Sequence, residues 1–243
     1  MQAIIIAAGQ GSRLWQTTAQ QPKTLLPIGD GTILSRILGN LATVGIDRCR
    51  MVIGFQGERI RSYIQGLASA HPPVVFYENR EWLRGNGLSV LAAYGTGHAR
   101  QQVDEEGILL SMSDHLVSPP ALGAMIAGPP TESTLLVDRR LDQVFDLDDA
   151  TKVLMEGRRI LAIGKELSEY NAVDCGVFRL AAPMFRALRS SIESGKESIS
   201  DAARELIRDR GFEGQEIPAG SAWIDIDTPE AYRHACAHAG DYA

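Results

Sequence analysis

The first half of the chain alternates short hydrophobic runs with segments in which apolar residues recur every three or four positions. Strands are predicted at the hydrophobic runs 3–8, 50–54, 74–77 and 107–112. The run 3–8 has no polar alternation, which is typical of a central parallel strand covered on both faces. Helices are predicted at 32–45, at 58–67 and from residue 88. This βαβαβ order predicts right-handed crossovers and a ligand site at the carboxyl ends of the strands.

The second half of the chain is less regular, and its strands and helices do not simply alternate. Strands are predicted at 133–137, 150–154, 159–163, 173–178 and 222–227. Helices are predicted at 119–127, 183–192 and 198–208 and from residue 229 onward. The segment 142–149 contains four aspartates; we interpret it as a solvated hairpin, with contact of one aspartate to a substrate hydroxyl as the alternative. The pattern predicts an α/β fold with a Rossmann-like, mostly parallel central sheet, helices on both faces and a small mixed β insertion in the second half.

Length and composition favour a single domain over residues 1–243. At 44% hydrophobic residues the chain can bury a substantial core, and no linker, repeat or low-complexity tract interrupts it. A net charge of −6 argues against binding to nucleic acid or anionic membranes. No apolar run reaches the ~20 residues of a membrane span, and the first strand leaves no room for a signal peptide, so we expect a cytoplasmic protein. Cys49, Cys175 and Cys236 are spaced too widely for a disulfide framework or a zinc site, which predicts reduced thiols.

The first candidate for chemistry follows the strand at 3–8. Glycines at 9 and 11 allow backbone N–H groups to approach an anion, and Arg13 and Lys23 add two cations. Leu14 stands where the dinucleotide fingerprint needs its third glycine, and the chain contains no GxxxxGK[ST] motif. We interpret the stretch as a cradle for a triphosphate; a tight turn with a solvated arginine is the alternative.

A second candidate is the Gly85-Asn86-Gly87-Leu88-Ser89 stretch. The Asn86 amide offers both a donor and an acceptor to the edge of a base, and the flanking glycines let a base lie against the backbone. An ordinary helix N-terminus with a polar cap would have the same composition. The stretch therefore predicts a nucleoside pocket, with a plain helix cap as the alternative.

Three aspartates form the third candidate. Asp114 follows the strand at 107–112, at the sheet edge where ligands bind. Asp225 and Asp227 alternate along a predicted strand and so point to the same side, where a cation would relieve their repulsion. Oxygen ligands without a Cys or His cluster select a hard ion, so we predict Mg²⁺ at Asp114, Asp225 and Asp227. Exposed strand-end carboxylates are the alternative.

The string Ala7-Ala8-Gly9-x-Gly11-Ser12-Arg13-Leu14, followed by Pro22-Lys23-x-Leu25-Leu26-Pro27, resembles the signature of the nucleotidyltransferases that join a nucleoside triphosphate to a sugar phosphate or alcohol phosphate. The resemblance implies a GT-A-like fold with a nucleotide-binding half, 1–115, and an acceptor-binding half, 116–243. It implies that the triphosphate is wrapped by Ala8, Gly9, Gly11 and Ser12. It also implies that Arg13 and Lys23 steady the α-phosphate, and that the nucleoside is held by Gly85, Asn86 and Ser89. For the acceptor, it implies contacts from Lys165, with Lys152 in reserve, and from Asp174.

Further motifs, among them Met112-Ser113-Asp114-His115, Ile163-Gly164-Lys165-x-Leu167 and Trp223-x-Asp225-x-Asp227-Thr228, are most similar to CTP:inositol-1-phosphate cytidylyltransferases. The resemblance implies transfer of CMP from CTP to inositol 1-phosphate, with pyrophosphate leaving in line and Mg²⁺ as cofactor. A sugar-1-phosphate nucleotidyltransferase that uses another NTP, a phosphocholine or aminoalkylphosphonate cytidylyltransferase, and a non-catalytic nucleotide sensor are the alternatives. The expected partners are thus CTP and a small phosphorylated acceptor, without nucleic acid or membrane insertion, and the sequence leaves monomer and homodimer open.

Overall fold

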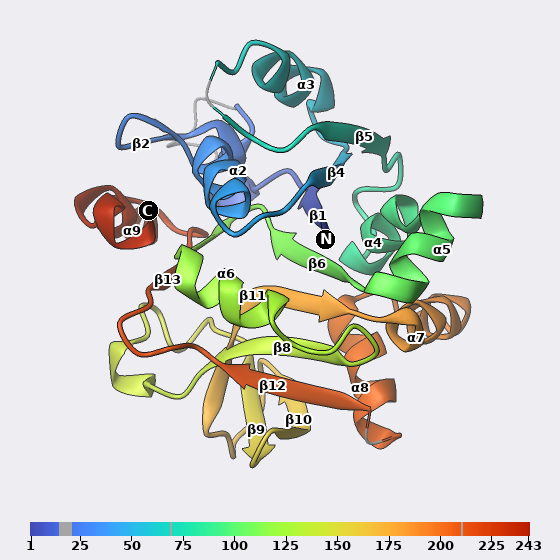
Figure 1. Ribbon diagram of the computed structural model, residues 1–243. Coiled ribbons are helices and arrows are strands. Elements are labelled where there is room, and N and C mark those ends of the chain that lie inside the picture. Colours follow the sequence, from blue (N-terminus) through green and yellow to red (C-terminus); the bar gives the residue numbers. More distant parts are fainter. Residues whose placement is uncertain (15–20, 69, 210) are drawn as a thin grey trace.

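The hydrophobic run at the start of the chain forms β1 (Gln2–Ala7), which is buried along its whole length. We describe residues 1–14, 21–68, 70–209 and 211–243 of a computed structural model (Figure 1). Alternate side chains of β1 enter two separate cores, with Ala3 and Ile5 on one face of the sheet and Ile4 and Ile6 on the other. The expectation of a strand covered on both faces is confirmed, and it explains why this strand has no polar alternation.

β1 belongs to a nine-stranded sheet that includes strands from both halves of the chain. In spatial order the strands are β5 (Val74–Glu78), β4 (Arg48–Ile53), β1, β6 (Ile108–Met112), β11 (Ala172–Leu180), β8 (Ser133–Asp138), β12 (Phe212–Glu216), β10 (Arg159–Gly164) and β9 (Lys152–Glu156). Pairing is parallel from β5 through β6 and again between β8 and β12. It is antiparallel where β11 meets β6 and β8, and between β12, β10 and β9. The predicted α/β class is confirmed, with a parallel first half and a mixed second half.

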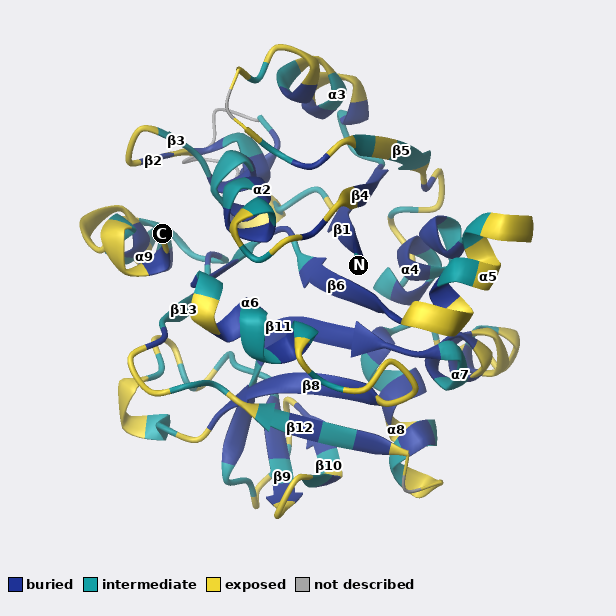
Figure 2. Cartoon of the chain, in the orientation of Figure 1, coloured by how far each residue is buried: buried dark blue, intermediate teal, exposed yellow. Residues whose placement is uncertain are grey.

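Helices cover both faces of this sheet (Figures 1 and 2). One core contains residues of α2 (Ile33–Thr43), α3 (Gly57–Gln65), α6 (Pro119–Ile126) and α9 (Pro229–Ala237). The other core contains residues of α4 (Asn86–Tyr94), α5 (Gly97–Glu106), α7 (Ala182–Glu193) and α8 (Ile199–Arg208). Figure 2 shows the buried sides of these helices turned toward the strands and their exposed sides turned outward. Among the described helices, none is long and apolar enough to cross a membrane.

Side-chain caps fix where several helices begin. Thr32 accepts a hydrogen bond from the Ser35 N–H, and the Ser35 hydroxyl accepts one from the Thr32 N–H, forming a capping box at the start of α2. Thr228 caps α9 by accepting from the Ala231 N–H at 3.1 Å, and Pro229 occupies its first turn. The cap at Thr228 also fixes the chain that leaves the short strand β13 (Trp223–Asp225).

β13 pairs antiparallel with β7 (His115–Val117), and this small ribbon lies beside the main sheet at the carboxyl end of β6. The pairing places Asp225 directly opposite His115. A second two-stranded ribbon joins β2 (Pro27–Ile28) to β3 (Gly31–Thr32) ahead of α2. The first ribbon brings the carboxylates predicted from the last third of the chain next to the acid that follows β6.

The structure differs from the sequence-based expectations at several places. β7 was not predicted, and the strand predicted at 222–227 ends at Asp225, so Asp227 lies beyond it and does not alternate with Asp225 along the strand. α5 was not expected, because Val103 is its only buried residue and it lacks an apolar stripe. β12 was not expected either, because Phe212 and Gly214 are its buried positions and its sequence is mostly polar. The hairpin predicted at 142–149 is wrong: the described residues there form a 3-10 helix, η3 (Leu141–Gln143), and a turn in which Asp146 has a left-handed φ of 57°. The cysteines are free, as predicted, with Cys49 and Cys175 buried and Cys236 exposed.

Candidate active site

The predicted cradle lies at the carboxyl end of β1 and lines a cavity. The turn after β1 runs into the 3-10 helix η1 (Ser12–Leu14), and the chain returns through η2 (Lys23–Leu25). Gly11 has a left-handed φ of 61°, and a Cβ there would stand 3.0 Å from the Lys23 Cβ, so glycine lets these two segments approach. The cavity is lined by Ala8, Gly9, Gly11, Ser12, Arg13 and Lys23, together with residues of the nucleoside stretch and Asp114 and Asp227. The sequence-predicted triphosphate residues therefore do lie together.

The Lys23 side chain is buried between two of the predicted carboxylates. Its residue is 8% exposed, and its Nζ donates to Asp114 Oδ2 at 2.8 Å and to Asp227 Oδ1. Burial lowers the pKa of Lys23, but the charges of Asp114 and Asp227 outweigh this effect and leave the pKa raised. Lys23 is therefore a permanent ammonium at neutral pH, and it ties η2 to the turn after β6 and to the segment after β13.

A cluster of possible metal ligands adjoins this lysine. Ligand atoms of Asp114, His115 and Asp225 all lie within 4.8 Å of one another. His115 Nδ1 lies 2.8 Å from Asp114 Oδ1, and His115 Nε2 lies 3.8 Å from Asp225 Oδ2. Burial lowers the pKa of His115, but Asp225 and Asp114 raise it to about 9, so the imidazolium bridges both carboxylates. Asp227 is joined to this cluster through Lys23 rather than through His115.

A bulge in β11 makes room for His115. The register of β11 against β8 shifts between Asp174 and Phe178, and Gly176 within this stretch has a left-handed φ of 74°. A Cβ at Gly176 would overlap the His115 ring. That ring is also stacked on Trp223, with the centroids 6.2 Å apart and an interplanar angle of 8°. The bulge therefore fixes the histidine between β11 and β13.

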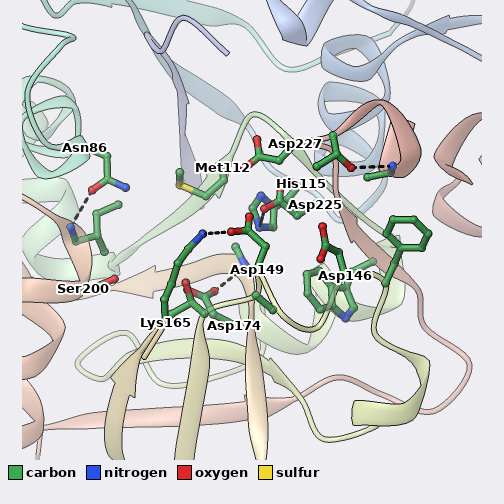
Figure 3. Close-up of a pocket in the computed structure, with 18 of the residues that line it drawn as sticks. Asn86, Met112, His115, Asp146, Asp149, Lys165, Asp174, Ser200, Asp225 and Asp227 are labelled. Atoms are coloured by element: carbon green, nitrogen blue, oxygen red, sulfur yellow. Dashed lines mark hydrogen bonds and ion pairs between the residues drawn. The ribbon is translucent and has the colours of Figure 1, made fainter. Parts of the chain in front are cut away.

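A second cavity lies on the downstream side of these carboxylates (Figure 3). It shares Asn86, Met112 and Asp227 with the first cavity, so the two adjoin. Its carboxylates are those of Asp146, Asp149, Asp174, Asp225 and Asp227. Its aromatic residues are His115, Phe145, Phe178 and Trp223. Lys165 supplies a cation, and Figure 3 shows this side chain and Asp149 pointing toward one another.

The predicted acceptor residues have different positions relative to this second cavity. Lys165, which follows β10, lines it and donates to Asp149 Oδ1 at 2.8 Å. Asp174 also lines it; burial raises the pKa of Asp174 to about 6, although Gly176 N–H donates to its Oδ1 at 2.7 Å. Lys152 is 9% exposed and donates to the Asp148 backbone carbonyl at 2.6 Å. Of the two lysines, Lys165 alone is among the described residues that line this cavity.

The nucleoside stretch begins α4 and is tied to the start of α8. Asn86 Oδ1 accepts from the Ile199 backbone N–H at 2.9 Å, and Asn86 lines both cavities (Figure 3). Ser89 lines the first cavity and accepts from Asn79 Nδ2 at 2.9 Å. Gly85 is the N-cap of α4, where a Cβ would overlap the backbone of Glu197. The stretch is thus a helix start, and its Asn86 and Ser89 are also part of the cavity wall.

Four residues of the site had no assigned role in the sequence analysis. Trp82 lines the first cavity, with its ring 5.4 Å from that of Phe55 in an edge-on contact. His115 bridges two predicted metal ligands, Phe145 lines the second cavity, and Asp149 pairs with both Arg13 and Lys165. His115 was visible as the neighbour of Asp114, and Asp149 as one of four aspartates. Nothing in the local sequence distinguished their contacts.

The chain has the fold of solved nucleotidyltransferases. The inositol-1-phosphate CTP transferase from T. maritima superposes on this chain with a TM-score of 0.80 at 24% identity, covering 95% of this chain and 90% of that one. The chain belongs to the family of the MobA-like NTP transferase domain, which matches residues 3–145. The nucleotidyltransferase resemblance read from the sequence is thereby confirmed.

Two relatives extend this comparison. A bifunctional IPC transferase and DIPP synthase of Rubrobacter xylanophilus is 30% identical over 232 residues, which cover 95% of this chain and 50% of that relative. A 2-aminoethylphosphonate cytidylyltransferase of Lancefieldella rimae is 29% identical over 161 residues, covering 64% of this chain and 60% of the relative. The chain therefore spans about half the length of the bifunctional relative that it matches.

Proposed function

We propose that this chain transfers CMP from CTP to a phosphorylated alcohol, with inositol 1-phosphate as the acceptor and pyrophosphate as the second product. The observation that carries the proposal is the pair of adjoining cavities, each of which is lined by cationic side chains that the other lacks. Arg13 and Lys23 line the first, Lys165 lines the second, and Asp227 lies at their junction. The names of the bifunctional relative and of the T. maritima enzyme support this choice of substrates.

In this proposal the residues of the first cavity bind the nucleotide. The backbone at Gly9 and Gly11 receives the phosphates, and Arg13 and Lys23 balance the charge that develops at the α-phosphorus. The Asn86 oxygen already accepts from a backbone N–H, so its amide nitrogen is the group left to donate to a base. Cytosine offers acceptors at O2 and N3 for such a donor.

Asp114 and Asp225, whose ligand atoms lie within 4.8 Å of one another, also fit a divalent cation. Asp225 Oδ1 is buried and has no hydrogen-bond partner among the described residues. Burial and the charges of Asp114 and Asp227 raise the pKa of Asp225, although the His115 charge opposes them. We assign Asp114, Asp225 and Asp227 to hold Mg²⁺, which when bound would neutralise phosphate oxygens as the pyrophosphate leaves. His115, which contacts both Asp114 and Asp225, would then hold these two carboxylates in position for the ion.

The acceptor needs no general base in this scheme. A phosphomonoester is largely ionised at neutral pH, so its oxygen can attack the α-phosphorus directly once it is positioned. Lys165 binds the acceptor phosphate and brings it to the junction of the cavities, where the new P–O bond forms and the bond to pyrophosphate breaks. The carboxylates of the second cavity accept hydrogen bonds from the acceptor's hydroxyl groups.

The test is release of pyrophosphate from CTP and inositol 1-phosphate with Mg²⁺ present, followed by detection of CDP-inositol. We expect turnover with CTP that stops on addition of EDTA and returns with excess Mg²⁺. A preference for a purine nucleotide or for UTP would move the assignment to a sugar-1-phosphate nucleotidyltransferase. No turnover with any nucleoside triphosphate across a panel of phosphorylated acceptors would reject the enzyme and favour a nucleotide sensor.

One observation favours a second acceptor class, phosphorylated amines. The lining of the second cavity combines five carboxylates with Phe145 and Trp223, and this is the chemistry that binds an ammonium group through charge and cation–π contact. The aminoethylphosphonate cytidylyltransferase relative agrees with this alternative. Phosphocholine and 2-aminoethylphosphonate therefore belong in the acceptor panel. In this alternative, Phe145→Ala raises the KM for the amine acceptors; for inositol 1-phosphate it should change little.

A further inference from the structure

Asp149 pairs with a cation from each of the two cavities. Its Oδ2 accepts from Arg13 Nη1 at 2.8 Å, and its Oδ1 accepts from Lys165 Nζ at 2.8 Å. The two cations come from opposite halves of the chain: Arg13 is 136 residues from Asp149 in the sequence, and Lys165 is 16 residues from it. One carboxylate therefore occupies, with its two oxygens, the place between the cations to which the proposed function assigns substrate phosphates.

The backbone around Asp149 is held in place by contacts of its own. The Asp146 carbonyl accepts from the N–H groups of Asp149 and Ala150, at 3.2 and 3.3 Å, and closes a turn. Lys152 donates to the neighbouring Asp148 carbonyl at 2.6 Å. Asp146 keeps a left-handed φ in this turn, a conformation that aspartate tolerates better than most residues. The backbone at Asp149 is thus held by hydrogen bonds of the loop itself, in addition to the two ion pairs of its carboxylate.

The two ion pairs are weak enough to exchange. The side chains of Arg13, Asp149 and Lys165 are 52%, 37% and 49% exposed, so water screens both pairs. The hydrogen bonds from Lys165 and Arg13 lower the pKa of Asp149, so the carboxylate stays charged at neutral pH. By contrast, the Lys23 ammonium is buried between its two partners.

We propose that Asp149 is a counter-ion that competes with substrate: it occupies Arg13 and Lys165 until a phosphate group displaces it. This inference rests on the proposed function, because it takes Arg13 and Lys165 as the phosphate-binding cations. Small anions such as inorganic phosphate must compete with a carboxylate that is already in place. A triphosphate gains further contacts with Lys23 and the glycine turn, so it overcomes this competition more easily.

The experiment compares Asp149→Asn with Asp148→Asn, using inorganic tripolyphosphate and inorganic phosphate as probes in calorimetric titrations. Asp148 is an exposed neighbour whose substitution removes the same charge one residue away. We expect Asp149→Asn to lower the Kd of each probe about two- to five-fold, the range that screened ion pairs of this kind allow. Asp148→Asn should leave both values close to those of the wild type.

The same substitution made in the Arg13→Gln variant shows how much of the tighter binding comes from the Arg13–Asp149 ion pair. In Arg13→Gln, the additional Asp149→Asn change should tighten tripolyphosphate binding less than it does in the wild type, because Lys165 is then the one partner of Asp149 left to be freed. If Asp148→Asn and Asp149→Asn tighten binding equally, the effect is one of net charge. That result would leave the proposed function standing and overturn this proposal. Unchanged or weaker binding by Asp149→Asn would overturn it as well, since it would give Asp149 a purely structural role. If tripolyphosphate binds none of these proteins, the cradle itself is misassigned and the proposed function is overturned together with this inference.

Discussion

Replacing Lys23 by methionine should separate the stability of the site from its activity. Methionine keeps most of the side-chain volume but removes the charge that lies between Asp114 and Asp227. Removing one partner of a buried ion pair costs about 3–5 kcal/mol, because the remaining charge is left uncompensated. Here Asp114 keeps His115 and Asp227 keeps Arg13, so we expect a loss near 3 kcal/mol in the free energy of unfolding. Since domains of this kind have about 5–15 kcal/mol of stability, the variant should remain folded.

We expect the kcat of Lys23→Met to fall much further than its loss of stability would explain. A preorganised donor aimed at the developing charge contributes about 10²–10³-fold to kcat, and Lys23 is the buried member of the proposed pair. The assay is pyrophosphate release under saturating CTP and acceptor, alongside urea denaturation of the same preparation. Lys152→Met is the matched control, because it also removes a buried ammonium, but one that donates to a backbone carbonyl. Equal losses of kcat in the two variants, or a wild-type kcat in Lys23→Met, would refute the assignment of Lys23.

Three further predictions test other parts of the site. Lys165→Ala should raise the KM for the acceptor several-fold and leave that for CTP nearly unchanged; in steady-state kinetics, an effect confined to CTP would contradict its placement. Gly176→Ala should destabilise the protein by more than the ~1 kcal/mol expected from a left-handed φ alone, because its Cβ would overlap His115; Gly157→Ala, left-handed with open space, is the control in urea denaturation. Burial raises the pKa of Asp138, but hydrogen bonds from Arg140 and Trp223 outweigh it, so the native pKa is lowered. The advantage of the wild type over Asp138→Asn should therefore be present above about pH 4 and disappear as the pH falls through the native pKa; a constant difference in urea midpoints down to acid pH would contradict this.

The sequence was informative wherever one local pattern determined one local structure. The unbroken hydrophobic run of β1 reflects burial on both faces, and Thr228 with Pro229 predicted the start of α9 correctly. α5 escaped prediction because a helix with a single buried residue has no apolar periodicity to detect. Its position is set by the contact of Val103 with the core and by hydrogen bonds to α5 from Gln2 and Arg50.

The contacts of the site were harder to predict because they join distant parts of the chain. The aspartate that pairs with Arg13 lies 136 residues away, within a group of four that composition cannot distinguish. The place of His115 depends on a glycine in the bulge of β11, which no pattern near residue 115 indicates. Lys152 and Lys165 have similar positions in the sequence, next to paired strands, but one donates to a backbone carbonyl and the other to a carboxylate in the cavity. Which of the two lysines reaches the cavity depends on the direction of its side chain, and that direction follows from the fold.

The ion pairs of the site explain how an acidic chain can be built to receive two polyanions. Each cation assigned to phosphate has a carboxylate partner. Lys23 pairs with Asp114 and Asp227, Arg13 pairs with Asp227 and Asp149, and Lys165 pairs with Asp149. Substrate binding in the proposed function is then an exchange of carboxylate for phosphate, so its cost depends on how deeply each pair is buried. The screened pairs at Asp149 should exchange first, while the buried Lys23 keeps its partners and its position. The difference in burial would therefore explain why Lys23 stays fixed at the reacting phosphorus while Arg13 and Lys165 can exchange their carboxylate partner for a phosphate.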